Sequence, residues 1–247
     1  MRRTESDGGL DRAPDPGPRR AKQEAWEGVV DVAPAAIAAV PIGLLFGALA
    51  AAKGLSVLEV ALMSALVCAG GAQFAIVEMW SYPVPIGTIV VATILINSRH
   101  VLMGASLAPK TGAFRRWQKL LTFHTLVDET WAFGERRAMR RPLTPAYFGA
   151  MGAVLWCNWV TFTTLGAAAG SLLGDPAAIG ADFAFTALFI GIVASLWRGP
   201  ASALPVLAAA VSGAVVYRFI GTPWHVLAGA AAGIAAAALT WRPADPR

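Results

Sequence analysis

Charged residues are scarce in this chain: Asp, Glu, Lys and Arg make up 14% of its 247 residues, whereas 56% are hydrophobic. A soluble domain of this length carries far more charge, so the composition is that of a polytopic membrane protein. The net charge of +5 does not indicate nucleic-acid binding, because the lysines and arginines lie at the ends of apolar runs. In such positions they orient a membrane protein and contact the anionic headgroups of the lipid bilayer.

Cysteine and the common catalytic motifs are also scarce or missing. Cys68 and Cys157 both lie inside apolar segments, and two such positions provide neither a disulfide framework nor a zinc site. The sequence has no HExxH motif, no GxSxG motif and no glycine-rich phosphate loop after a strand. A His124–Asp128 pair acting with a serine from elsewhere is left open, but nothing requires it. We therefore predict that the protein is not an enzyme and has no cofactor or metal.

Long apolar runs dominate the rest of the chain. A helix needs about 20 apolar residues to cross the roughly 30 Å hydrocarbon core of a bilayer. Seven segments fit or approach this length, and we predict spans at residues 33–52, 57–79, 84–108, 146–173, 182–197, 201–220 and 223–241. Small residues such as Gly43 and Gly47, four positions apart, let helix backbones approach closely. The predicted fold class is therefore all-α, a tightly packed bundle of about seven transmembrane helices.

The two ends of the chain differ in composition. Residues 1–30 are rich in Arg, Asp, Pro and Gly and have almost no large aliphatic side chains, which is typical of a disordered tail. Residues 31–247 contain all the apolar runs and form the predicted transmembrane domain.

Charge placement sets a problem for the topology. The tail and the segment 110–141 are both basic, so the positive-inside rule places both in the cytoplasm. Three predicted spans separate them, which puts them on opposite sides. Either residues 120–134 dip into the membrane as a re-entrant or partial span, or an early span is broken, or the tail lies outside. We favour a partial crossing at 120–134, which at 15 residues is short for a full span.

A polar cluster, Asn97-Ser98-Arg99-His100, interrupts the apolar run 84–107 near its middle. An ionisable residue at such depth indicates a functional site. Four consecutive residues of a regular helix point in different directions, so either Arg99 meets an acid on another helix or the helix is interrupted and the cluster lines a polar pocket. The guanidinium group suits a substrate carboxylate, to which it can donate two parallel hydrogen bonds. The alternatives are a structural ion pair or an arginine that reaches the interface.

Further polar groups lie in two other segments. Asp128 and Glu129 are the simplest partners for Arg99 and can bind and release protons, although they can also be solvated charges on an interfacial helix. Gln73 follows Gly70-Gly71-Ala72 and can hydrogen-bond either a substrate or a neighbouring helix. The predicted substrate-binding or ion-coupling residues are Gln73, Asn97, Arg99, His100, Asp128 and Glu129.

Four motifs, in this order and spacing, resemble the AzlC family, the large subunits of bacterial branched-chain amino acid exporters. They are PIGLLFGALAAAKGLS (41–56), GAQF (71–74), INSRHVLMGASLAP (96–109) and LVDETWAF (126–133). The resemblance implies a multi-pass inner-membrane protein that works with a small AzlD-type membrane subunit. It also implies secondary export of valine, isoleucine, leucine and, in some members, methionine, driven by the proton or electrical gradient.

The resemblance supplies no settled site residues, so the six predicted above rest on their chemistry alone. Two other functional classes stay open. One is a non-transporting membrane scaffold or assembly subunit, for which the deep polar cluster would be dispensable. The other is an intramembrane enzyme, which would need a third polar group aligned with His124 and Asp128.

Overall fold

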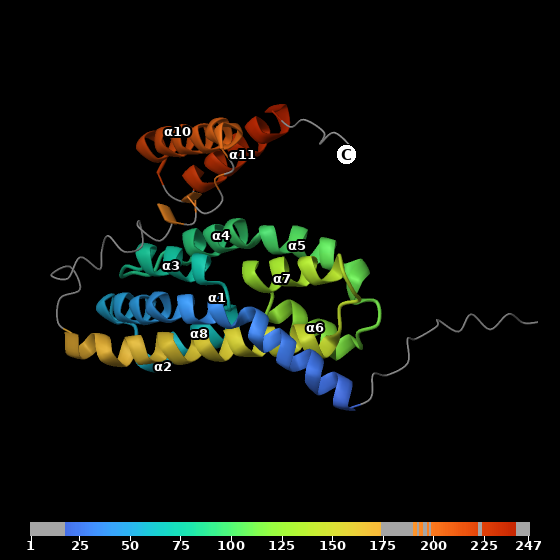
Figure 1. The fold of residues 1–247 in the computed structure, drawn as a ribbon. Helices are drawn as coiled ribbons and strands as arrows, with labels where there is room; N and C mark the ends of the chain where they lie inside the picture. The colour runs from blue at the N-terminus through green and yellow to red at the C-terminus, as the bar shows by residue number, and fades with distance from the viewer. Residues whose placement is uncertain are drawn as a thin grey trace, which may run out of the picture. The chain divides into compact units, whose positions relative to one another are not determined.

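The computed structural model describes residues 18–173, 190, 191, 193, 194, 197, 199–221 and 224–240. Within that part of the chain every regular element is a helix (Figure 1), which confirms the predicted all-α fold class. Three described helices are long and apolar enough to cross a membrane: Arg19–Ala52, Ile86–Thr111 and Pro200–Phe219. The predicted span 182–197 lies almost entirely outside the described residues, so the count of about seven spans stays a prediction.

The elements follow one another as helices joined by short connections. In chain order they are α1 (Pro18–Ala52), α2 (Val57–Val67), α3 (Gly70–Met79), α4 (Ile86–Asn97), α5 (Arg99–Leu107), η1 (Ala108–Thr111), α6 (Arg116–His124), α7 (Asp128–Ala138), α8 (Pro145–Leu173), η3 (Pro200–Ser202), α10 (Ala203–Phe219) and α11 (Trp224–Thr240).

These helices form two compact units. Unit 1 contains residues 1–38 and 102–158, and unit 2 contains residues 39–101 and 159–247. Helices α1 and α8 contribute their N-terminal parts to unit 1 and their C-terminal parts to unit 2. Residues 18–30, which the composition assigns to a disordered tail, are helical as the first turns of α1. Their acidic side chains pair with Arg137 of α7, in the same unit, as described below.

Helices α1 and α8 run parallel and approach closely through small residues. In unit 2 the contacting pairs are Gly43 with Phe162, Gly47 with Thr163 and Ala167, and Ala48 with Gly170. Because the residue numbers of both helices rise together, the helices point the same way. A Cβ atom on Gly47 would collide with the α8 backbone, so this position requires glycine. The predicted close packing through Gly43 and Gly47 is thus confirmed.

The predicted span 57–79 is wrong, because the chain reverses inside it. Cys68, between α2 and α3, has a left-handed backbone with φ of 43°. The Gln73 side chain donates to Ser64 Oγ at 3.2 Å, whereas nine residues of continuous helix would separate these positions by about 13.5 Å. Lys53 Nζ also donates to the Glu78 carbonyl at 3.4 Å, which brings the two ends of the hairpin together. Gly70 and Gly71 weaken a continuous helix at this point.

Segment 120–134 also turns back on itself. Phe123, late in α6, packs against Gly104, in the second half of α5, and α6 begins soon after α5 ends, so α6 runs back along α5. Helix α7 runs parallel to α5 and the η1 turn after it, because Trp131 donates to Ser106 of α5 at 2.8 Å and Glu135, further along α7, pairs with Lys110 of η1. Helices α6 and α7 therefore form a hairpin, and the re-entrant or partial span at 120–134 stays a prediction.

The last two described helices form a separate antiparallel pair. Gly229 of α11 packs against Ala209 of α10, and Gly233 packs against Ala209 and Pro205. Gly221 ends α10 with φ of +93°, a left-handed conformation that glycine adopts without the usual Cβ penalty.

Candidate functional site

The polar cluster at 97–100 coincides with an interruption between α4 and α5. Around Ser98 the backbone makes two i to i+3 hydrogen bonds, from Ser98 to Leu95 at 3.3 Å and from Val101 to Ser98 at 3.1 Å. The Ser98 hydroxyl also donates to the Leu95 carbonyl at 2.7 Å. Serine back-bonding of this kind bends helices, and a tightened turn inside a long helix often marks a hinge. The helix is therefore tightened at Ser98, where α4 ends and α5 begins, and the predicted meeting of Arg99 with an acid stays a prediction.

Two buried polar atoms on α4 have no hydrogen-bond partner among the described residues. Thr93 Oγ1 and Asn97 Oδ1 are buried and make no hydrogen bond with any residue that the structure describes. They lie one helical turn apart and so share a face of α4. Buried polar atoms are nearly always satisfied, so such an atom calls for an explanation. A polar ligand on this face would provide one.

The other cluster residues are less enclosed. The His100 ring nitrogen Nδ1 lies 3.1 Å from the Asn97 carbonyl oxygen, which orients the imidazole along the helix. Arg99, Asp128 and Glu129 are exposed. Arg99 belongs to unit 2, whereas the two acids belong to unit 1, so their predicted pairing stays a prediction.

Gln73 lies in a closed polar network inside unit 2. Its side chain is fully buried. Besides donating to Ser64, it accepts a hydrogen bond from Trp159 Nε1 at 2.8 Å. Thr163 donates to Ser64 at 2.8 Å and completes the link from the α2–α3 hairpin to α8. These contacts favour the role of joining helices over direct contact with a substrate.

Aromatic rings enclose this network. Phe46 of α1 packs edge-on against Phe74 at a centroid distance of 5.2 Å and stacks on Trp159 at 6.0 Å. The Gly70 position lies against the Trp159 ring. The hairpin is therefore held by apolar packing with a small, satisfied polar core.

Unit 1 contains an ion cluster that the sequence analysis missed. Arg137 of α7, with a side chain only 6% exposed, pairs with Glu24 and with Glu27, the latter at 2.8 Å. Thr144 donates to the same Glu24 oxygen at 3.1 Å. The Arg137 guanidinium also lies 4.0 Å from the centre of the Tyr147 ring, a favourable cation–π contact.

Two further groups extend this cluster. The Tyr147 hydroxyl donates to Asp31 at 2.6 Å, and Arg141 lies 3.3 Å from Glu27. Burial lowers the pKa of the Arg137 guanidinium, but hydrogen bonding to Glu27 and attraction to both glutamates raise it by more, so Arg137 stays charged. The spacing of Glu24, Glu27 and Asp31 on one helical face was the available signal, and the disordered-type composition around them hid it.

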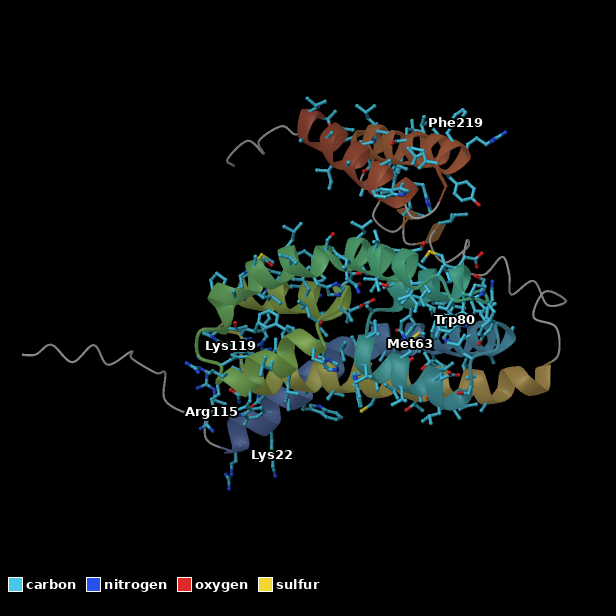
Figure 2. All side chains as sticks on the ribbon, turned by 180° about the vertical axis from the view of Figure 1, so that it is seen from behind. Lys22, Met63, Trp80, Arg115, Lys119 and Phe219 are labelled. Atoms are coloured by element: carbon cyan, nitrogen blue, oxygen red, sulfur yellow. The ribbon has the colours of Figure 1, made fainter. Side chains whose placement is uncertain are left out.

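Basic side chains gather at the end of unit 1 where this cluster lies. Figure 2 shows Lys22 of α1 and Arg115 and Lys119 of the α6 segment at the same end of the ribbon. Lys22 and the basic start of the α6 segment therefore lie at one end of unit 1, an arrangement that fits the positive-inside rule.

Membrane-length apolar helices, short helical hairpins and a polar turn inside an apolar helix, all within the described residues, are typical of a polytopic membrane protein. The family model of the AzlC protein matches residues 34–173. The chain belongs to the AzlC family.

Similar proteins agree with this assignment. Inner membrane protein YgaZ of Escherichia coli K12 is 30% identical over 229 residues, covering 90% of this chain and 92% of that protein. An uncharacterized membrane protein of Archaeoglobus fulgidus is 31% identical over 216 residues, covering 86% and 90%. No solved structure matches.

Proposed function

We propose that the protein is the large subunit of a secondary transporter that exports aliphatic amino acids across the inner membrane. The proposed substrates are valine, leucine, isoleucine and methionine, and the proposed partner is a small AzlD-type membrane subunit. The observation that carries the proposal is the turn between α4 and α5, where the buried Thr93 and Asn97 oxygens have no partner among the described residues and Arg99 follows in the sequence of an otherwise apolar run. Membership of the AzlC family supports it.

A zwitterionic substrate places three demands on such a site. Its carboxylate needs a strong donor, and the planar Arg99 guanidinium can offer two parallel N–H groups. Its ammonium group needs an acceptor, which Asn97 Oδ1 can supply; Asp128 and Glu129, in unit 1, are kept as proposed substrate-binding or ion-coupling acids. Its branched side chain needs apolar surroundings, which the Val, Ile and Leu residues of α4 and α5 provide.

The turn at Ser98 makes these polar groups accessible to a ligand. A regular helix would satisfy its own backbone and spread the four polar side chains around its axis. Carriers place substrate sites at discontinuous helices, where backbone groups and local flexibility become available to the ligand. Irregular backbone at membrane depth is stable only where protein or water covers it.

The test is efflux of valine, leucine, isoleucine and methionine from peptide-loaded cells, with and without the small subunit. Arg99→Gln should abolish efflux at an unchanged protein level, because glutamine keeps a donor but loses the charge and the fork. Arg140→Gln, at an exposed arginine outside the cluster, is the matched control and should export normally. Undiminished efflux by Arg99→Gln would contradict the proposal and favour a scaffold role.

A further inference from the structure

We infer that Arg137 is a positioning residue for transport: its ion pairs with Glu24 and Glu27 fix α7, and with it the Asp128–Glu129 end of that helix. The transport part of this inference rests on the proposed function. The inference also assigns a role to the first turns of α1, which precede the family match at residues 34–173.

The geometry of the cluster restrains rotation as well as position. Two nitrogens of one guanidinium bind two carboxylates, one turn apart on α1. Because the guanidinium is planar, two such contacts define its orientation as well as its location. Thr144 holds Glu24, and the Tyr147 ring covers Arg137 from α8. Three elements thus meet at one buried charge.

A second clamp acts on nearly the opposite side of α7. Glu135 pairs with Lys110 and accepts a hydrogen bond from Ser106 at 2.9 Å. Residues 135 and 137 are about 200° apart around a helix that turns 100° per residue. Helix α7 is therefore held from α5 through an acid and from α1 through a base. Neither sliding nor rotation of α7 leaves both clamps intact.

Helix α7 transmits this restraint to its first turn. Asp128 and Glu129 lie in the first turn and Arg137 in the last, within one uninterrupted helix from Asp128 to Ala138. The whole helix is about 16 Å long, so a rotation at one end displaces the side chains at the other. Gly134 packs against Phe148 and Leu107, which keeps the middle of α7 close to α5 and α8.

The chemistry of the cluster fits positioning better than bulk stability. A buried ion pair contributes little net stability compared with apolar packing, but removing one partner leaves an uncompensated charge. Glu24 and Glu27 face Arg137 from α1, Arg141 faces Glu27 from the following loop, and Tyr147 faces Arg137 from α8. Such a set of charges stabilises one specific arrangement of α1, α7 and α8 over others.

The experiment measures valine uptake into inverted membrane vesicles that contain the full chain and the small subunit. Arg137→Gln should raise KM roughly tenfold with little change in the maximal rate per transporter, because the binding groups are displaced. Arg137→Lys should recover part of the loss, since it restores the charge without the fork. Glu24→Gln should resemble Arg137→Gln more weakly, and exposed Arg140→Gln should match wild type.

A transport-independent readout keeps the inference testable if Arg137→Gln is poorly inserted or if valine is not a substrate. Cys68 and Cys157 are replaced by alanine, and Glu129→Cys is labelled with a maleimide. Arg137→Gln should change the labelling rate about fivefold or more, as expected for a displaced side chain, and Arg140→Gln should not.

The outcomes separate the two proposals. Unchanged KM and unchanged labelling, with only less protein in the membrane, would overturn the positioning role. Altered labelling in a protein that carries no aliphatic amino acid would support the positioning role and refute the proposed function.

Discussion

Arg137 of α7 binds Glu27 of α1 at 2.8 Å across 110 residues of sequence. This contact places the start of α1 beside the C-terminal end of the α6–α7 hairpin, and Thr144, just before α8, also contacts Glu24. The N-terminal ends of α1 and α8 therefore lie close together in unit 1.

This arrangement predicts that Lys22 and Arg115 face the same side of the membrane and that Ala52 faces the other. All three positions are exposed, and α1 connects Lys22 to Ala52 in one continuous helix. Single-cysteine variants probed with a membrane-impermeant thiol reagent should show Lys22→Cys and Arg115→Cys in the cytoplasm, where the basic residues belong. Labelling of Lys22→Cys and Arg115→Cys from opposite sides would refute this topology.

The close α1–α8 contact predicts that two glycines respond oppositely to the same substitution. Gly47→Ala should lower the free energy of unfolding by about 1–3 kcal/mol, because the added Cβ meets the α8 backbone. Gly149→Ala, where nothing lies within 4 Å, should be neutral or raise it by up to about 1 kcal/mol through helix propensity. Thermal unfolding of the purified protein measures both. Equal effects would show that the close approach is absent.

The Gln73 network predicts a stability effect without a substrate effect. Trp159→Phe removes the donor to Gln73 Oε1 but keeps most of the ring that stacks on Phe46. The unpaired amide should cost about 1–3 kcal/mol of unfolding free energy, while KM for valine stays at the wild-type value. A large rise in KM with unchanged stability would instead assign Gln73 to substrate contact.

The unpartnered hydroxyl of Thr93 predicts a trade between stability and affinity. Thr93→Val keeps the shape and removes a buried polar atom that has no partner among the described residues. The free energy of unfolding without substrate should rise by about 1 kcal/mol, whereas KM for the transported amino acid should increase. Thr88→Val, one α4 residue that is not among the unpartnered groups, is the matched control. A loss of stability in Thr93→Val would mean that the hydroxyl has a partner in the folded protein.

The parts of the site that could be predicted are those with a local signal. Arg99 is conspicuous because it lies alone in an apolar run, and the neighbouring Ser98 is where the helix is interrupted. Glu24 and Glu27 gave no such signal, because acidic residues in a proline- and arginine-rich stretch have the composition of a solvated tail. Their role depends on Arg137, which is more than a hundred residues away in the sequence. The reversal at Cys68 was missed for a similar reason. Residues 57–79 have the length and hydropathy of one span, and hydropathy does not show whether the chain continues or turns back.

By itself the sequence determined that this is a membrane protein built of helices, with a polar cluster deep in an apolar run. These properties follow from composition and length, which act residue by residue through the cost of placing polar groups in hydrocarbon. Only the tertiary structure decided where the chain reverses, which side the start of α1 shares with α8, and that Arg137 is enclosed by Glu24 and Glu27. The reversals depend on contacts 9 to 25 positions apart and the enclosure of Arg137 on contacts more than a hundred positions apart, and the energies of these contacts exist only once the helices have packed.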